Sequence, residues 1–333
     1  MKPVGIIVNP NSGKDIRRLV SPASVFNDHE KINIINRLLT AMDDLGIERV
    51  LMMPDAIGLA RGALHATANR LSTLKVELLD MVPDGSYRDS LGAAALLAKA
   101  ECACIITLGG DGTNRIVAKA CADVPLLPIS AGTNNVFPYL VEATIAATAA
   151  AAVVKGIVAV ERACLRMPVL ELYVNGEFAD LALIDLVAVD QLQVGARAVW
   201  DPGIIGEIFL TRARPQDIGL SSIGGCLYPM PLDSGLGLHI FPGEGKHQVL
   251  APITPGRVQA IPVKTYTTFK PGESIKVEFT PCIIALDGER EIQIERDDRV
   301  EVILNLQGPR VIDIDTTLSD AVAGGFLAVN QNP

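Results

Sequence analysis

Residues 103–114 read ACIITLGGDGTN and join two kinds of structure. The first half, Ala103–Leu108, is an almost uninterrupted apolar run and predicts a buried strand. The glycines that follow let the backbone approach a ligand, and a helix expected near Arg115–Ala122 offers free N–H groups and the positive end of its dipole. Because open parallel sheets bind ligands at the carboxyl ends of their strands, the segment predicts a phosphate site. A glycine-rich turn capped by an aspartate is the alternative.

Asp111 is the unexpected residue of this segment. A carboxylate beside phosphates is repelled by them, so its presence there indicates either a metal ion or a role in proton transfer.

Two other polar, glycine-containing segments also follow expected strands. NPNSGK, residues 9–14, comes after the apolar run Val4–Val8, and SAGTNN, residues 130–135, comes after Leu126–Ile129. Each alone is compatible with ordinary turn chemistry. Three such loops at the ends of successive parallel strands predict the phosphate site of a nucleotide.

The order of expected elements divides the chain. Up to about residue 155, strands and helices alternate, which predicts an α/β domain with a mostly parallel sheet. Beyond it, short strands are joined by hairpin turns such as Asn175-Gly176, which predicts a mainly antiparallel, β-sandwich-like domain. The expected domains are residues 1–155, which bind the nucleotide, and residues 156–314, which bind the acceptor. The tail, 315–333, is expected to pack back on the first domain.

Composition excludes several classes of protein. The chain has 333 residues, of which 49% are hydrophobic and 20% charged, and its net charge is −9 with a single tryptophan. This balance argues against nucleic-acid binding, which needs clustered basic residues, and no segment resembles a membrane anchor. The first apolar run is too short for a signal peptide, and the six cysteines are scattered in apolar segments, so we expect a cytoplasmic protein without disulfides.

Arg212 and Arg214 are expected on a solvated face, with phosphate binding as the alternative.

The motifs resemble those of a known superfamily. Gly109–Thr113 is similar to the GGDGT motif that NAD kinases share with diacylglycerol and sphingosine kinases and, more distantly, with phosphofructokinases. The opening Asn9–Gly13, the loop Gly132–Asn135 and the turn Leu286–Glu289 resemble further loops of that superfamily. ALIDLVA (182–188), GLSSIGG (219–225) and APITPG (251–256) look more like NAD kinases. Over nearly its whole length the chain is most similar to the ATP–NAD kinase-like proteins of acetoin catabolism clusters, the protein X group.

The resemblance implies a fold and a reaction. It implies an α/β domain, a β-sandwich-like domain and a cleft between them in which the γ-phosphoryl group of ATP passes to a hydroxyl with Mg²⁺ present. NAD, phosphorylated at the 2′-hydroxyl of its adenosine ribose to give NADP, is the leading acceptor. The resemblance also implies a link to acetoin catabolism. A homodimer or homotetramer is implied by the same analogy.

Site residues carry over position by position. Asp111 is expected to accept a proton or to organise Mg²⁺ with the phosphates, Asp287 matches the base of the lipid-kinase branch, and Asp185 and Glu289 are expected at the acceptor. Since Asp-Gly also favours a two-residue hairpin turn, a purely structural Asp287 is the alternative. The expected nucleotide ligands are Asn9, Ser12, Gly13, Lys14, Gly109, Gly110, Gly112, Thr113, Asn114, Gly132, Thr133, Asn134 and Asn135.

Two departures leave the acceptor open. Ile184-Asp185 stands where NAD kinases have Asn-Glu, which removes an amide and shortens a carboxylate. Asn135-Val136-Phe137 stands where lipid kinases have Asn-Asp-Phe. A lipid or another small hydroxyl compound is therefore an alternative acceptor, polyphosphate an alternative donor, and a nucleotide-sensing regulator without turnover the alternative from another class.

Overall fold

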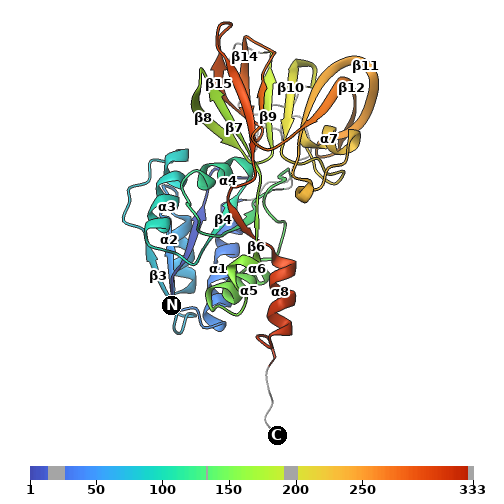
Figure 1. Cartoon of the computed structure of the whole chain (residues 1–333). Helices are drawn as coiled ribbons and strands as arrows, with labels where there is room; N and C mark the ends of the chain where they lie inside the picture. The colour runs from blue at the N-terminus through green and yellow to red at the C-terminus, as the bar shows by residue number, and fades with distance from the viewer. Residues whose placement is uncertain (14–26, 133, 191–201, 329–333) are drawn as a thin grey trace.

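The chain folds into two lobes, an α/β lobe and a β lobe (Figure 1). The computed structural model describes residues 1–13, 27–132, 134–190 and 202–328. The fold class expected from the sequence is confirmed, because the first lobe is built on a mostly parallel sheet and the second on antiparallel sheets.

The α/β lobe is built on a seven-stranded sheet with the order β3-β2-β1-β4-β5-β17-β6, in which only the pair β17–β6 is antiparallel. Its strands are β1 (Val4–Val8), β2 (Arg49–Met52), β3 (Lys75–Leu78), β4 (Cys104–Gly109), β5 (Leu126–Ser130), β6 (Cys164–Arg166) and β17 (Arg310–Ile312). Its helices are α1 (Asp28–Asp44), α2 (Leu59–Thr67), α3 (Tyr87–Lys99), α4 (Asp111–Ala118), α5 (Ala143–Val154), α6 (Val160–Ala163) and α8 (Ile314–Ala323).

Helix α1 shows why the sequence pattern predicts this lobe well. Asn27 begins the helix by accepting the N–H of Glu30 at 2.8 Å, an N-cap bond. Its apolar residues recur at helical spacing, so Ile35, Leu38 and Met42 are all fully buried against the sheet.

Among the described helices, none is both long enough and apolar enough to cross a membrane.

The β lobe contains two antiparallel sheets, ordered β12-β11-β10-β9-β14-β15 and β13-β16-β7-β8. One cluster of buried side chains, including Leu172, Leu186, Phe209 and Val302, draws on both sheets and fills the space between them. The strands are β7 (Val169–Val174), β8 (Glu177–Ala182), β9 (Asp185–Val189), β10 (Ile205–Leu210), β11 (Gly237–Thr254), β12 (Arg257–Phe269), β13 (Ser274–Lys276), β14 (Cys282–Leu286), β15 (Glu289–Ile294) and β16 (Val300–Asn305). The helical turns are η2 (Pro202–Ile204), α7 (Ser221–Leu227) and η3 (Leu232–Ser234).

Both Asn-Gly and Asp-Gly form the two-residue hairpin turns that the sequence indicates. Asn175 and Gly176 join β7 to β8 with φ of 55° and 83°, and Asp287 and Gly288 join β14 to β15 with φ of 49° and 80°. Positive φ at both central residues is the requirement of a type I′ turn.

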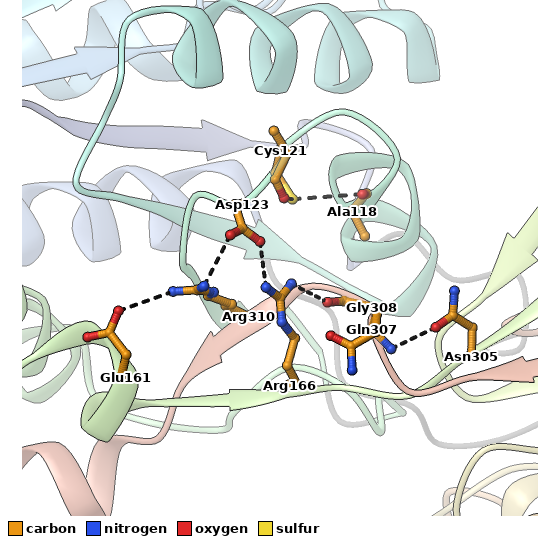
Figure 2. A network of polar contacts seen from close by, with 10 residues as sticks. Ala118, Cys121, Asp123, Glu161, Arg166, Asn305, Gln307, Gly308 and Arg310 are labelled. Carbon is orange, nitrogen blue, oxygen red and sulfur yellow. Dashed lines mark hydrogen bonds and ion pairs between the residues drawn. The ribbon is translucent and has the colours of Figure 1, made fainter. Parts of the chain in front are cut away.

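The chain crosses between the lobes twice, and both crossings are tied to the first sheet. Residues 156–166 and 310–314, which the sequence pattern places in the second domain, contribute β6, α6 and β17 to the α/β lobe. Arg166 and Arg310 both bind Asp123, at 2.7 and 3.1 Å, in the loop between α4 and β5 (Figure 2). Helix α8 then packs against α5 on the same lobe, as Figure 1 shows.

Candidate active site

The two glycine loops of the α/β lobe touch at the end of the sheet. β4 ends at Gly109, Gly110 precedes α4, and a Cβ on Gly110 would lie 2.7 Å from Oδ1 of Asn135. Only glycine allows this approach, so the glycine-rich segment 109–114 and the segment 130–135 form one surface. Asn135 is held in turn by Ser130, whose hydroxyl accepts from its Nδ2 at 2.8 Å.

The N-terminal loop joins the same surface. Asn9 donates from Nδ2 to the hydroxyl of Thr113 at 2.8 Å, and Ser12 donates from Oγ to the carbonyl of Asn9 at 2.7 Å. All three segments predicted to bind the nucleotide therefore lie together at the carboxyl ends of β1, β4 and β5. Gly13, Gly132 and Asn134 are partly exposed members of these loops, whereas Lys14 and Thr133 lie outside the described residues.

Asn114 is buried inside its own loop. Its Oδ1 accepts the Thr107 hydroxyl at 2.5 Å, and its Nδ2 donates to the carbonyl of Gly110 at 2.9 Å. With zero exposure, its side chain shapes the glycine turn from within.

Lys31 holds the N-terminal loop in place by bonding its backbone, a role that the sequence pattern does not indicate. Its ammonium is fully buried, donates to the carbonyl of Pro10 at 2.7 Å and lies 3.6 Å from Asp28. A lysine in the first turn of an amphipathic helix is not expected to be buried, although this one falls on the apolar side of α1.

Asp111 is partly exposed at the first position of α4. Its carboxylate accepts the N–H groups of Val136, at 3.0 Å, and of Phe137, at 2.8 Å. The side chain thus fixes the end of the second glycine loop and stays at the surface where the three loops meet.

Arg212 from the β lobe reaches the same peptide. Its Nη2 donates to the carbonyl of Val136 at 2.7 Å, and its guanidinium lies 5.9 Å from the centroid of the Phe137 ring. Burial lowers the pKa of Arg212, as does Arg214, while the carboxylates of Asp217, Asp111 and Asp287 oppose this shift. The expectation of a solvated Arg212 is wrong, because the side chain turns inward to the junction of the lobes, where only 3% of the residue is exposed.

Asp287 lies in the β14–β15 turn, and its side chain is buried against the connection between β8 and β9. Its carboxylate accepts the N–H groups of Leu183, Ile184 and Asp185, the shortest at 2.7 Å from Ile184. Burial raises the pKa of Asp287 to about 7, against the lowering effect of Arg115 and these N–H groups. The geometry gives Asp287 a clear structural task at the β8–β9 connection.

Glu289 and Asp185, the other two residues expected at the acceptor, lie next to this turn. Glu289 lies against the α/β lobe, where a Cβ on Gly112 would be 2.8 Å from its Oε1. Asp185 is buried at the start of β9, and its carbonyl accepts the N–H of Asp287 at 2.9 Å. Ile184, in place of the family's amide, is only 1% exposed and packs in the apolar core.

A buried ion pair joins α4 to the β lobe. Arg115, fully buried, binds Asp180 of β8 at 3.0 Å, and Lys119 binds the same carboxylate at 2.9 Å. Nothing in the sequence pairs these residues, because they are distant along the chain and belong to different domains. The helix that begins at the Gly109–Gly110 turn is therefore held by both lobes.

The fit to Mg²⁺ rests on Asp111. Within the described ranges, no group of three or more His, Cys, Asp or Glu side chains could hold a metal ion by itself. Mg²⁺ needs no such group when it enters with a nucleotide, since it takes one or two carboxylates and completes its shell with phosphates and water. A partly exposed carboxylate beside a glycine-rich loop fits that mode.

Known proteins resemble both halves of the chain. Residues 4–158 match the family model of the ATP-NAD kinase N-terminal domain, and residues 168–307 match that of the acetoin catabolism protein X C-terminal domain. A yeast NADH kinase solved with NADH overlaps in structure with a TM-score of 0.49 and 13% identity, covering 100% of this chain and 90% of that one. Acetoin catabolism protein X of Cupriavidus necator is 38% identical over 329 residues, covering 96% of this chain and 92% of the relative. The chain therefore belongs to the acetoin catabolism protein X family.

Proposed function

We propose that this protein is an ATP-dependent kinase that transfers the γ-phosphoryl group to a hydroxyl. The observation that carries the proposal is the convergence of three loops at the carboxyl ends of parallel strands and at the start of α4, where Asn9 bonds Thr113 and Asp111 bonds the 130–137 segment. Such an edge offers backbone N–H groups and a helix dipole to phosphates. The ATP–NAD kinase domain over residues 4–158 supports the same reaction class.

In this proposal the loops position the substrates, and Asp111 accepts a proton from the acceptor. Phosphoryl transfer needs mainly orientation and neutralisation of charge, which the glycine loops and bound Mg²⁺ supply. Asp111, partly exposed and fixed by Val136 and Phe137, accepts the proton of the attacking hydroxyl.

NAD is the acceptor that we favour, with its adenosine 2′-hydroxyl as the nucleophile and NADP as the product. Glu289 lies against Gly112 and so borders the phosphate loop from the acceptor lobe. Asp185 is the second acceptor residue of the proposal. A physiological link to acetoin catabolism rests on the family alone.

A nucleotide-binding regulator without turnover is the second candidate. Asp287 is enclosed by three backbone N–H groups and Ile184 is packed in the core, so two positions associated with the acceptor in related kinases serve structure here. This arrangement favours binding over catalysis more than the sequence alone does.

Release of ADP from ATP and Mg²⁺ tests the proposal, with NAD, NADH, diacylglycerol or no acceptor. In a parallel series polyphosphate replaces ATP, and there the phosphorylated acceptor is measured because this donor releases no ADP. NAD-dependent ADP with an equal amount of NADP is the expected result. Wild-type protein that binds ATP tightly but forms no phosphorylated product with any acceptor would support the regulator instead.

A further inference from the structure

We infer that Arg212 is a positioning residue of the phosphate site, because it and Asp111 hold the peptide groups of Val136 from opposite lobes. We call this arrangement, formed by Asp111, Val136 and Arg212, the Val136 clamp. The inference rests on the proposed kinase function and adds to it a residue of the β lobe on which the α/β site depends.

The clamp uses both polar groups of one residue. Asp111 accepts the N–H of Val136 at 3.0 Å, and Arg212 donates to the carbonyl of the same residue at 2.7 Å. Both bonds are assisted by charge, which makes each stronger than a bond between neutral groups. The adjacent N–H of Phe137 also donates to Asp111, so two consecutive peptides are fixed.

Burial makes Arg212 a dedicated part of the clamp. Arg212 is 3% exposed, and its buried Nε has no hydrogen-bond partner among the residues that the structure describes. Removing a guanidinium from water is costly and is offset only by interactions made inside the protein. Here these are the Val136 carbonyl, the Phe137 ring and the carboxylates of Asp217, Asp111 and Asp287.

The clamp sets the position of the glycine loops. Asn135 precedes Val136 and lies against Gly110, at 2.7 Å from the place of a Cβ on that glycine. A shift of Val136 therefore moves Asn135 away from the phosphate loop and frees the Asp111 carboxylate to rotate. A displacement of 1 Å in such a site costs up to about 10²-fold in rate.

Arg214 provides a matched control two residues away. Its side chain is 33% exposed and binds Asp217 at 2.7 Å. It has the same chemistry as Arg212 and lies in the same segment. It acts on Arg212 only through its charge, and among the described residues its side chain bonds Asp217 and neither Asp111 nor Val136.

The test compares full-length Arg212→Met, Arg212→Lys and Arg214→Met. Hydrogen exchange of the Val136 and Phe137 amides is measured without nucleotide, and kcat and the KM for ATP are measured with the best acceptor. For Arg212→Met we expect amide exchange at least about tenfold faster and a kcat lower by about 10- to 100-fold, with a smaller change in KM. Lys at position 212 should restore part of both effects, since its ammonium can donate one bond to the carbonyl, and Arg214→Met should match the wild type.

Unchanged exchange at Val136 and Phe137 in folded Arg212→Met would overturn the inference. If Arg212→Met does not fold, Arg212→Lys decides by the same two readouts. Amide exchange and kcat in that variant should both depart from the wild type in the direction expected for Arg212→Met, by less than the full effect, and wild-type values would overturn the inference. If the wild type itself shows no turnover, the kinase proposal fails, whereas the exchange comparison still supports or contradicts the clamp.

Discussion

Asp111-Gly112 and Asp287-Gly288 are the same dipeptide in the two lobes, and the fold uses them in opposite ways. Asp111 begins a helix and remains partly exposed, whereas Asp287 forms a hairpin turn and is 6% exposed. Both carboxylates accept backbone N–H groups from a neighbouring loop. Burial, rather than residue type, separates the carboxylate that stays partly accessible from the one that is enclosed and bonds the β8–β9 connection.

Replacing Asp111 by Asn should have the largest effect on activity. Loss of a group that accepts a proton in the transition state lowers turnover by about 10²- to 10⁴-fold. The fold should persist, because the Asn oxygen can still accept from Val136 or Phe137. The measurement is ADP release, with circular dichroism to establish the fold.

A folded Asp111→Asn protein with wild-type turnover would contradict the role of Asp111. It would also remove the functional difference between the two dipeptides.

Replacing Asp287 by Ala should act mainly on stability. Three buried N–H groups, of Leu183, Ile184 and Asp185, lose their acceptor. We expect the free energy of unfolding to fall by about 2–4 kcal/mol, measured by urea denaturation. A loss below about 0.5 kcal/mol would show that these N–H groups find other partners.

The pH dependence of stability sharpens the contrast further. The Asp287 carboxyl has a pKa of about 7 in the folded protein against 3.8 as its ordinary value, so between these values the folded state holds a proton that the unfolded state has released. Its contribution to stability is therefore complete below the ordinary value and decreases as the pH rises to about 7.

Asp287→Asn cannot titrate and serves as the reference. The unfolding free energy of the wild type minus that of Asp287→Asn should decrease from about pH 4 to about pH 7 and then level off, as followed by urea titrations at successive pH values. A difference that does not vary with pH would mean that Asp287 is ionised throughout this range.

Replacing Asp123 should have the smallest effect of these substitutions. It binds two arginines, Arg166 and Arg310, but its side chain is 64% exposed. Replacing it by Asn should change the free energy of unfolding by no more than about 1 kcal/mol, because solvent screens exposed ion pairs. Thermal unfolding at low and high salt measures this, and a loss as large as that of Asp287→Ala would contradict the importance given to burial.

The sequence predicts the fold class and the three loops because both depend on local patterns. Apolar runs followed by glycine and polar residues identify the ends of β1, β4 and β5 without knowledge of tertiary structure. Asn-Gly and Asp-Gly likewise specify their turns through backbone conformation alone.

The residues that couple the lobes could not be predicted in this way. Arg212 and Asp180 acquire their roles from partners far along the chain, and their own neighbours in sequence suggest exposed positions. The strands β6 and β17 are short, three residues each, and join the first sheet only through a long-range return of the chain. Such features depend on topology, which periodicity does not encode.

The return of the chain has a consequence for synthesis. β17 and α8 are made after the whole β lobe, yet β17 covers the edge of β5 and α8 covers α5. Roughly 150 residues separate α5 from β17, so at 5–20 residues per second the α/β lobe waits on the order of 10 s for its last pieces. A premature stop anywhere in the β lobe would therefore leave the earlier α/β lobe incomplete as well.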